Sequence, residues 1–232
     1  MGPGLPRPPV RGVIFDMDGL LVDTLPIWRE IGNGLFAAHD VDISPVTEAG
    51  VVMGMSVGQA MVLLRGYAGW TADQHADLEH RVVADVVAAI LDGAELKPGA
   101  AAALDFCEAR GLAMALASGS SRPILEAVVK RFGFAGRFAA VCSAADDTLG
   151  KPHPAVFLRA ADEMEVPADA CLVLEDAVNG CIAAKAASMR VIAVPDGPAV
   201  GDPRFAIADL VLGSLEQLPS APALAVMGLA GR

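Results

Sequence analysis

The second half of the chain alternates short apolar runs with segments of helical periodicity. Runs of strand length lie at 112–117, 138–142, 171–174 and 190–194, and another lies near the N-terminus at 10–15. Helical segments fill the intervals at 124–132, 154–164 and 178–187. Strands joined through helices form right-handed βαβ units, which pair as a parallel sheet. The sequence therefore predicts an α/β fold with a Rossmann-like parallel sheet.

A helical insertion interrupts this pattern early. Residues 25–92 contain helical periodicity and no strand, and Lys97-Pro98-Gly99 marks a break after them. Thr24 is expected to cap the first helix of the insertion, with Pro26 in its first turn. We predict a core domain of residues 1–24 and 93–232 and an all-helical cap domain of residues 25–92. An insertion at this point would lie over the C-terminal edge of the sheet, where it can act as a lid.

Composition and charge limit the kinds of binding partner and the cellular location that we expect. The net charge of −11 argues against nucleic acid and anionic membranes, because both need a basic face. No run approaches the ~20 apolar residues of a membrane span, and the Pro/Gly-rich N-terminus lacks the apolar segment of a signal peptide. The four cysteines lack zinc-site spacing, so we expect reduced thiols in a cytoplasmic protein. We expect a monomer, since no long apolar seam is evident, and a loose tail at 221–230, which Pro222 and Gly228 interrupt.

The sequence Asp16-Met17-Asp18-Gly19 follows the first apolar run directly. Side chains at i and i+2 of a strand lie on one face, and the chain begins to turn at the strand's end. Both acids can therefore converge on the edge where open α/β sheets bind ligands. Carboxylates this close repel unless a cation lies between them. The pair indicates a metal site, a nucleophile with an acid/base partner, or both.

Three other polar segments follow predicted strands and are expected at the same edge. They are Ser118-Gly119-Ser120-Ser121, then Lys151 some eight residues beyond the strand that ends at Cys142, and Glu175-Asp176. Together the four segments hold what phosphoryl transfer needs. A carboxylate can attack phosphorus, and a second acid can protonate the leaving oxygen. Asp16 and Asp176 offer hard oxygen ligands for Mg²⁺, and Lys151 and Ser118 can stabilise charge on the phosphoryl oxygens.

These segments resemble the four motifs of the haloacid dehalogenase superfamily over about residues 10–218. The motifs read FDMDGLLVDT, the strand-end Ser118, Lys151 in GKPHP, and LEDAVNG. The helical insertion resembles the cap of the class that includes β-phosphoglucomutase and small sugar-phosphate phosphatases. Within that class the chain is most similar to the hexitol phosphatase and 2-deoxyglucose-6-phosphatase branch, on stretches such as LASGSSRPILE and DPRFAIADLVLGSLEQL.

The resemblance implies roles for individual residues. Asp16 would be the nucleophile and Asp18 the general acid/base. Mg²⁺ would be held by Asp16, the backbone carbonyl of Asp18, Asp176, and Glu175 directly or through water. Substrate would be bound by Ser118, Gly119, Ser120 and Lys151. Trp28 offers a flat face that suits a sugar ring, although packing within the cap is an equally good reading.

The resemblance also distinguishes between the reactions that members of this superfamily catalyse. Asp18 argues against a dehalogenase, which lacks the second aspartate, and the absence of lysine from residues 25–92 argues against phosphonatase chemistry. The phosphomutase branch carries a cap histidine where this chain has Trp28, and an arginine that residues 55–58 lack. We therefore expect a Mg²⁺-dependent phosphatase of small sugar or sugar-alcohol phosphates that works through an aspartyl phosphate. A phosphomutase is the second hypothesis. A catalytically silent binding protein is the third, against which the intact set of acids, lysine and serine speaks.

Overall fold

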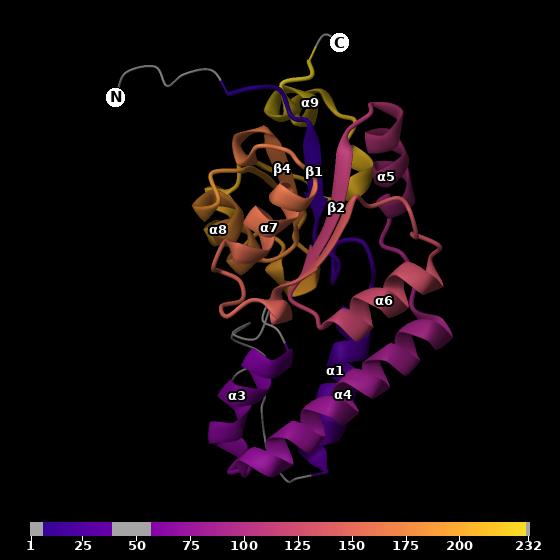
Figure 1. Ribbon diagram of the computed structural model, residues 1–232, viewed down its shortest axis with the longest axis vertical. Coiled ribbons are helices and arrows are strands. Elements are labelled where there is room, and N and C mark those ends of the chain that lie inside the picture. The colour runs from indigo at the N-terminus through magenta and orange to yellow at the C-terminus, as the bar shows by residue number, and fades with distance from the viewer. Residues whose placement is uncertain (1–6, 39–56, 231–232) are drawn as a thin grey trace.

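The computed structural model of the chain, which describes residues 7–38 and 57–230, centres on a parallel β-sheet (Figure 1). In this part of the chain the strands are β1 (Gly12–Phe15), β2 (Ala113–Ser118), β3 (Ala140–Ser143), β4 (Cys171–Glu175), β5 (Arg190–Ala193) and β6 (Leu210–Val211). They lie in the order β3-β2-β1-β4-β5-β6, and every neighbouring pair is parallel. The predicted α/β fold with a Rossmann-like parallel sheet is confirmed.

Helices cover both faces of the sheet. Helices α5 (Ala100–Ala109) and α6 (Arg122–Arg131) lie on one side, and α7 (Ala155–Glu163) and α8 (Val178–Ala186) on the other (Figure 1). Side chains of a strand alternate between faces, so β1 contributes to two cores. Val13 and Phe15 are buried in the core beneath α5 and α6, whereas Ile14 is buried in the core beneath α7 and α8.

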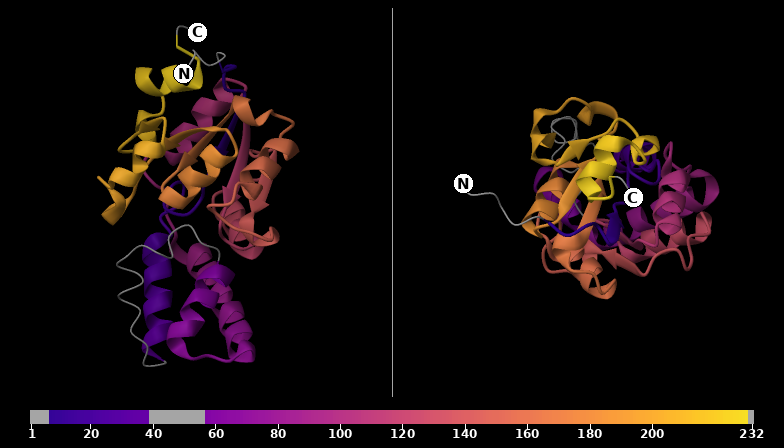
Figure 2. Two further views of the ribbon diagram at one scale, coloured as in Figure 1. Left: turned by 90° about the vertical axis from the view of Figure 1, so that its left-hand side faces the viewer. Right: turned by 90° about the horizontal axis from the view of Figure 1, so that it is seen from above.

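Between β1 and α5 the described part of the chain forms α1 (Leu25–Ala37), α3 (Val57–Ala68) and α4 (Ala72–Gly93). These helices form a group of their own beyond the end of the sheet, on the side opposite the two chain ends (Figures 1 and 2). Helix α4 packs against α1 and α3 and also against α6 of the sheet layer. The division into a core domain and a cap domain at residues 25 and 92 stays a prediction, and residues 39–56 of that cap lie outside the described residues.

The prediction of a loose tail at 221–230 is wrong. Residues Ala221–Met227 form helix α9, in which Ala223 and Met227 are fully buried. Pro222 stands in the first turn, where its missing N–H removes no helical hydrogen bond. The Met227 carbonyl accepts a hydrogen bond from the Val10 N–H at 2.9 Å, which ties the helix to the chain entering β1.

Helix α5 and strand β6 were also not predicted. Helix α5 has the sequence AAAALDFCEA, whose four opening alanines give little periodic contrast, and Ala103, Leu104 and Cys107 are buried. Strand β6 is only two residues long and is too short to produce a strand pattern. Thr24 stands at the first helix's N-cap position, but its side chain makes no cap hydrogen bond.

The cysteines and the lengths of the helices bear on two of the expectations from the sequence. All four cysteines are buried free thiols. Within residues 7–38 and 57–230, no helix combines the length and the apolar character that crossing a bilayer requires. The cytoplasmic location stays a prediction.

Candidate active site

The polar segments meet at the point where the strand order reverses. The chain runs outward from β1 through β2 to β3 and then returns to β4 on the other side of β1. Ligands bind at such switch points, outside the carboxyl ends of the strands. Phe15 pairs with Leu174, and the Asp16 N–H donates to the Leu174 carbonyl at 3.0 Å, so Asp16 leaves the sheet beside Glu175.

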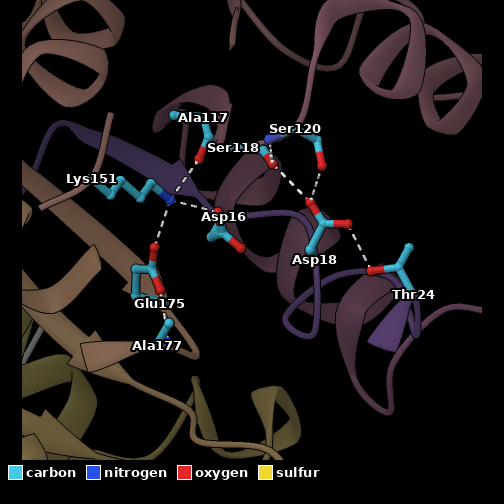
Figure 3. A network of polar contacts seen from close by, with 9 residues as sticks. All are labelled: Asp16, Asp18, Thr24, Ala117, Ser118, Ser120, Lys151, Glu175 and Ala177. Carbon is cyan, nitrogen blue, oxygen red and sulfur yellow. Dashed lines mark hydrogen bonds and ion pairs between the residues drawn. The ribbon is translucent and has the colours of Figure 1, made fainter. Parts of the chain in front are cut away.

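Lys151 connects the ends of three strands (Figure 3). Its Nζ donates to Asp16 Oδ1 and Glu175 Oε1, at 2.6 Å each, and to the Ala117 carbonyl at 3.2 Å. The Lys151 side chain is 1% exposed, and its Nζ lies 4.8 Å from the centre of the Phe157 ring. The predicted meeting of Lys151 with Asp16 is present, although 135 residues separate them.

Two glycines allow the backbone to close around the acids. Gly19 has φ of +78°, and a Cβ there would collide with Asp176 Oδ2. A Cβ at Gly180 would collide with the Glu175 carboxylate, so the first turn of α8 approaches that carboxylate only because the side chain is absent. Glu175 Oε2 also accepts the Ala177 N–H at 2.8 Å.

The acids form a set that fits a divalent cation. Asp16, Glu175 and Asp176 are buried, and each offers a carboxylate oxygen within 4.8 Å of the others. Lys151 supplies one positive charge against these three carboxyl groups, so the cluster is short of positive charge. Carboxylate oxygens are the ligands that Mg²⁺ prefers. Both oxygens of Glu175 already accept hydrogen bonds, so Asp16 and Asp176 are more available to bind a cation.

Burial dominates the proton affinity of this cluster. The pKa of Asp16 is raised from 3.8 to about 8 by all causes together: burial raises it most, Lys151 lowers it, and Glu175 and Asp18 raise it. The pKa of Asp176 is also raised well above its ordinary value, first by burial and then by Glu175 and Asp16. Burial would lower the pKa of Lys151, but Asp16 and Glu175 together raise it. Without a cation, Asp16 and Asp176 therefore bind protons more tightly than ordinary aspartates do, and a cation would compete with those protons.

This proton affinity predicts how the stability of the metal-free protein depends on pH. An unfolded aspartate loses its proton near pH 4, whereas folded Asp16 keeps it until about pH 8. The native state thus binds more protons across that window, and the free energy of unfolding falls as pH rises through it. We expect urea unfolding in EDTA to show lower stability at about pH 8.5 than at about pH 5.5. The Asp16→Asn variant should reduce this loss by more than about 1.4 kcal/mol, the value of one pKa unit. Equal pH dependence in the two proteins would contradict the assignment.

Asp18 lies next to this cluster and accepts hydrogen bonds from four side chains. At Oδ1 the donors are Thr24 Oγ1 at 2.7 Å and Trp28 Nε1 at 3.1 Å. At Oδ2 they are Ser118 Oγ and Ser120 Oγ, at 2.8 Å each (Figure 3). Thr24, expected to cap a helix, is fully buried and serves this carboxylate instead. The binding of phosphoryl oxygens by Ser118, Gly119 and Ser120 stays a prediction, as does the contact of Trp28 with a sugar ring.

A supporting network beside the site was not predicted. Ser143 Oγ donates to the Ser120 carbonyl at 2.7 Å. The Arg159 guanidinium donates to the Ser143 carbonyl at 2.7 Å and pairs with Asp147 at 3.0 Å. These contacts fix the loop that leads to Lys151. No spacing in the sequence indicates them, because Arg159 reaches back from α7 and resembles an ordinary solvated helix residue.

Known proteins resemble this chain in sequence along most of its length. The sequence model of the haloacid dehalogenase-like hydrolases matches residues 10–188. Hexitol phosphatase B of Escherichia coli (strain K12) is 37% identical over 209 residues, which are 90% of this chain and 94% of that protein.

Solved structures share the fold over most of the chain. The crystal structure of CbbY from Rhodobacter sphaeroides in complex with phosphate has a TM-score of 0.82 and 27% identity, covering 93% of this chain and 99% of that one. The structure of β-phosphoglucomutase from Clostridium difficile has a TM-score of 0.81 and covers 94% of this chain and 97% of that one. At 22% identity, this second likeness concerns the fold alone.

Proposed function

The chain belongs to the haloacid dehalogenase-like hydrolase family, and from that premise we propose that it is a Mg²⁺-dependent phosphatase of small sugar or sugar-alcohol phosphates. The observation that carries the proposal is the position of Asp16, whose carboxylate lies against Lys151 within the buried acidic cluster, with Asp18 two residues along. The similarity to hexitol phosphatase B supports a phosphorylated sugar alcohol as the substrate class.

In the proposed reaction, a carboxylate oxygen of Asp16 attacks phosphorus in line with the departing alcohol. Asp18 gives its proton to the alcohol oxygen as the P–O bond breaks. Water then attacks the aspartyl phosphate while Asp18 takes a proton from it, which releases phosphate and restores Asp16. Lys151 and the Ser118 hydroxyl would stabilise the phosphoryl oxygens, and helices α1, α3 and α4 would shield the site from bulk water.

The metal would be held by the Asp16 and Asp176 carboxylates and the backbone carbonyl of Asp18, with Glu175 close by. When bound, Mg²⁺ supplies positive charge that offsets the transferring phosphoryl group and the acidic cluster. The raised pKa values of Asp16 and Asp176 support this assignment, because they indicate a site with an unmet need for positive charge. The cytoplasmic location and the monomeric state stay predictions.

Phosphate release from a panel of phosphorylated metabolites tests the proposal. We expect hydrolysis of sugar-alcohol and sugar phosphates with Mg²⁺, and loss of at least about 10²-fold of the rate in EDTA. The panel should include glucose 1-phosphate as a substrate. Both glucose 6-phosphate and free phosphate should be measured as its products. Interconversion of the two sugar phosphates without release of phosphate would reject hydrolysis in favour of a phosphomutase. No reaction with any ester would favour a silent binding protein.

A further inference from the structure

We propose that Trp28 is a positioning residue for Asp18, and that its indole N–H directs the catalytic proton of Asp18 to Oδ2. This inference rests on the proposed function, in which Asp18 is the acid/base. It starts from the 3.1 Å hydrogen bond that Trp28 Nε1 donates to Asp18 Oδ1. Trp28 lies in α1, one of the helices between β1 and β2, whereas Asp18 follows the end of β1.

The four donors to Asp18 come from two parts of the molecule. Ser118 and Ser120 stand at and just beyond the end of β2, about a hundred residues away along the chain, and both hold Oδ2. Thr24 and Trp28 stand at the start and in the first turns of α1, and both hold Oδ1. The carboxylate is thus a bridge between the sheet and α1. Its orientation depends on where α1 lies.

The donors differ in what they can do when Asp18 carries a proton. A serine or threonine hydroxyl can turn and accept a hydrogen bond, whereas an indole N–H can only donate. Oδ1 must therefore remain an acceptor for Trp28, and a protonated oxygen is the poorer acceptor of the two. Oδ2 faces only hydroxyls, so the proton is best placed there. From Oδ2 it passes to the alcohol oxygen as the P–O bond breaks, and Oδ2 later takes a proton from water.

Trp28 also packs partly against the hydrophobic core, so a large truncation would disturb more than one contact. The Trp28→Phe variant keeps an aromatic ring and removes the N–H. Trp70→Phe is the matched control, because Trp70 stacks on Phe36 with ring centres 5.3 Å apart, within the same group of helices.

The kinetic test compares two esters in the presence of Mg²⁺. A sugar-alcohol phosphate has a poor leaving group that needs a proton, whereas p-nitrophenyl phosphate has a good one that does not. For Trp28→Phe we expect at least a tenfold lower kcat on the sugar-alcohol phosphate, with KM changed less than about threefold. The rate of phosphoenzyme formation from p-nitrophenyl phosphate, measured in a single turnover, should fall much less. Trp70→Phe should match the parent on both esters. Equal losses on the two esters, or a parental kcat, would overturn the proposal.

A spectroscopic test needs no activity and therefore separates this inference from the proposed function. The chain has two tryptophans, so ¹⁵N-labelled indole gives two cross-peaks, which the two Trp→Phe variants assign. Removing the acceptor with Asp18→Ala should move the Trp28 indole proton upfield and leave the Trp70 peak in place. An unmoved Trp28 peak would overturn the contact. A parent protein that hydrolyses no ester would reject the proposed function, and the peak would still decide whether Trp28 holds Asp18.

Discussion

Replacing Asp16 by asparagine is expected to lower kcat/KM by at least about 10⁴-fold, because removal of a covalent nucleophile costs this much or more in comparable enzymes. An amide oxygen is a poor nucleophile toward phosphorus, and no neighbouring group replaces it. Glu175 is engaged by Lys151 and the Ala177 N–H, and Asp18 by four donors. Phosphate release at saturating ester measures the loss.

The fold of this variant should persist, since asparagine has the shape of aspartate and removes one of three crowded acids. Circular dichroism and urea unfolding in EDTA check this directly. Asp105→Asn is the matched control, because Asp105 is 70% exposed on α5 and pairs with Arg137 away from the site. The control should keep parental activity. An Asp16→Asn variant with parental turnover would show that another group attacks phosphorus.

Replacing Lys151 by methionine should damage both stability and activity. Methionine keeps the length of the side chain but leaves Asp16 and Glu175 buried without their positive partner. Breaking a buried pair in this way costs about 3–5 kcal/mol of unfolding free energy. The loss should be larger at about pH 8.5 than at about pH 5.5. Lys151 lowers the pKa of Asp16, so without Lys151 the folded variant still binds a proton at about pH 8.5 that the unfolded chain has lost, whereas Asp16 of the parent releases it near pH 8. Loss of a donor to the phosphoryl oxygens should lower kcat by at least about 10²-fold.

Urea unfolding at the two pH values and phosphate release with Mg²⁺ measure these effects. Lys130→Met is the control, because Lys130 is exposed at the end of α6 and should change stability by less than about 0.5 kcal/mol. A Lys151→Met protein as stable and as active as this control would remove Lys151 from the proposed site.

Sequence reasoning recovered the sheet because each buried strand is a continuous apolar run bounded by helical segments. Strands β2 and β4 end one residue later than predicted. Ser118 and Glu175 are therefore the last residues of these strands and not the first residues after them. Helix α9 was missed because Pro222 was read as an interruption, whereas proline is well tolerated in a first turn. Alanine-rich α5 was missed for lack of polar contrast.

The convergence of Asp16, Lys151 and Glu175 followed from one rule, that parallel strands end at a common edge. The direction of individual hydrogen bonds did not follow from it. Ser118 was expected to face the phosphoryl group, yet its hydroxyl donates to Asp18 in this structure. Trp28 was expected to face a sugar or pack within the cap, and the sequence holds no sign that its N–H reaches Asp18. Such contacts depend on how α1 sits against the end of β2, which no local pattern encodes.

Covalent transfer of a phosphoryl group to Asp16 is the central claim, and trapping that intermediate tests it most directly. The protein with Mg²⁺ and a reactive phosphate ester, quenched in acid within one turnover and digested, should yield a peptide containing Asp16 that has gained the mass of one phosphoryl group. Asp16→Asn should yield none, and treatment with hydroxylamine should remove the modification from the parent peptide. Rapid release of phosphate with no modified Asp16 peptide at any quench time would contradict the account.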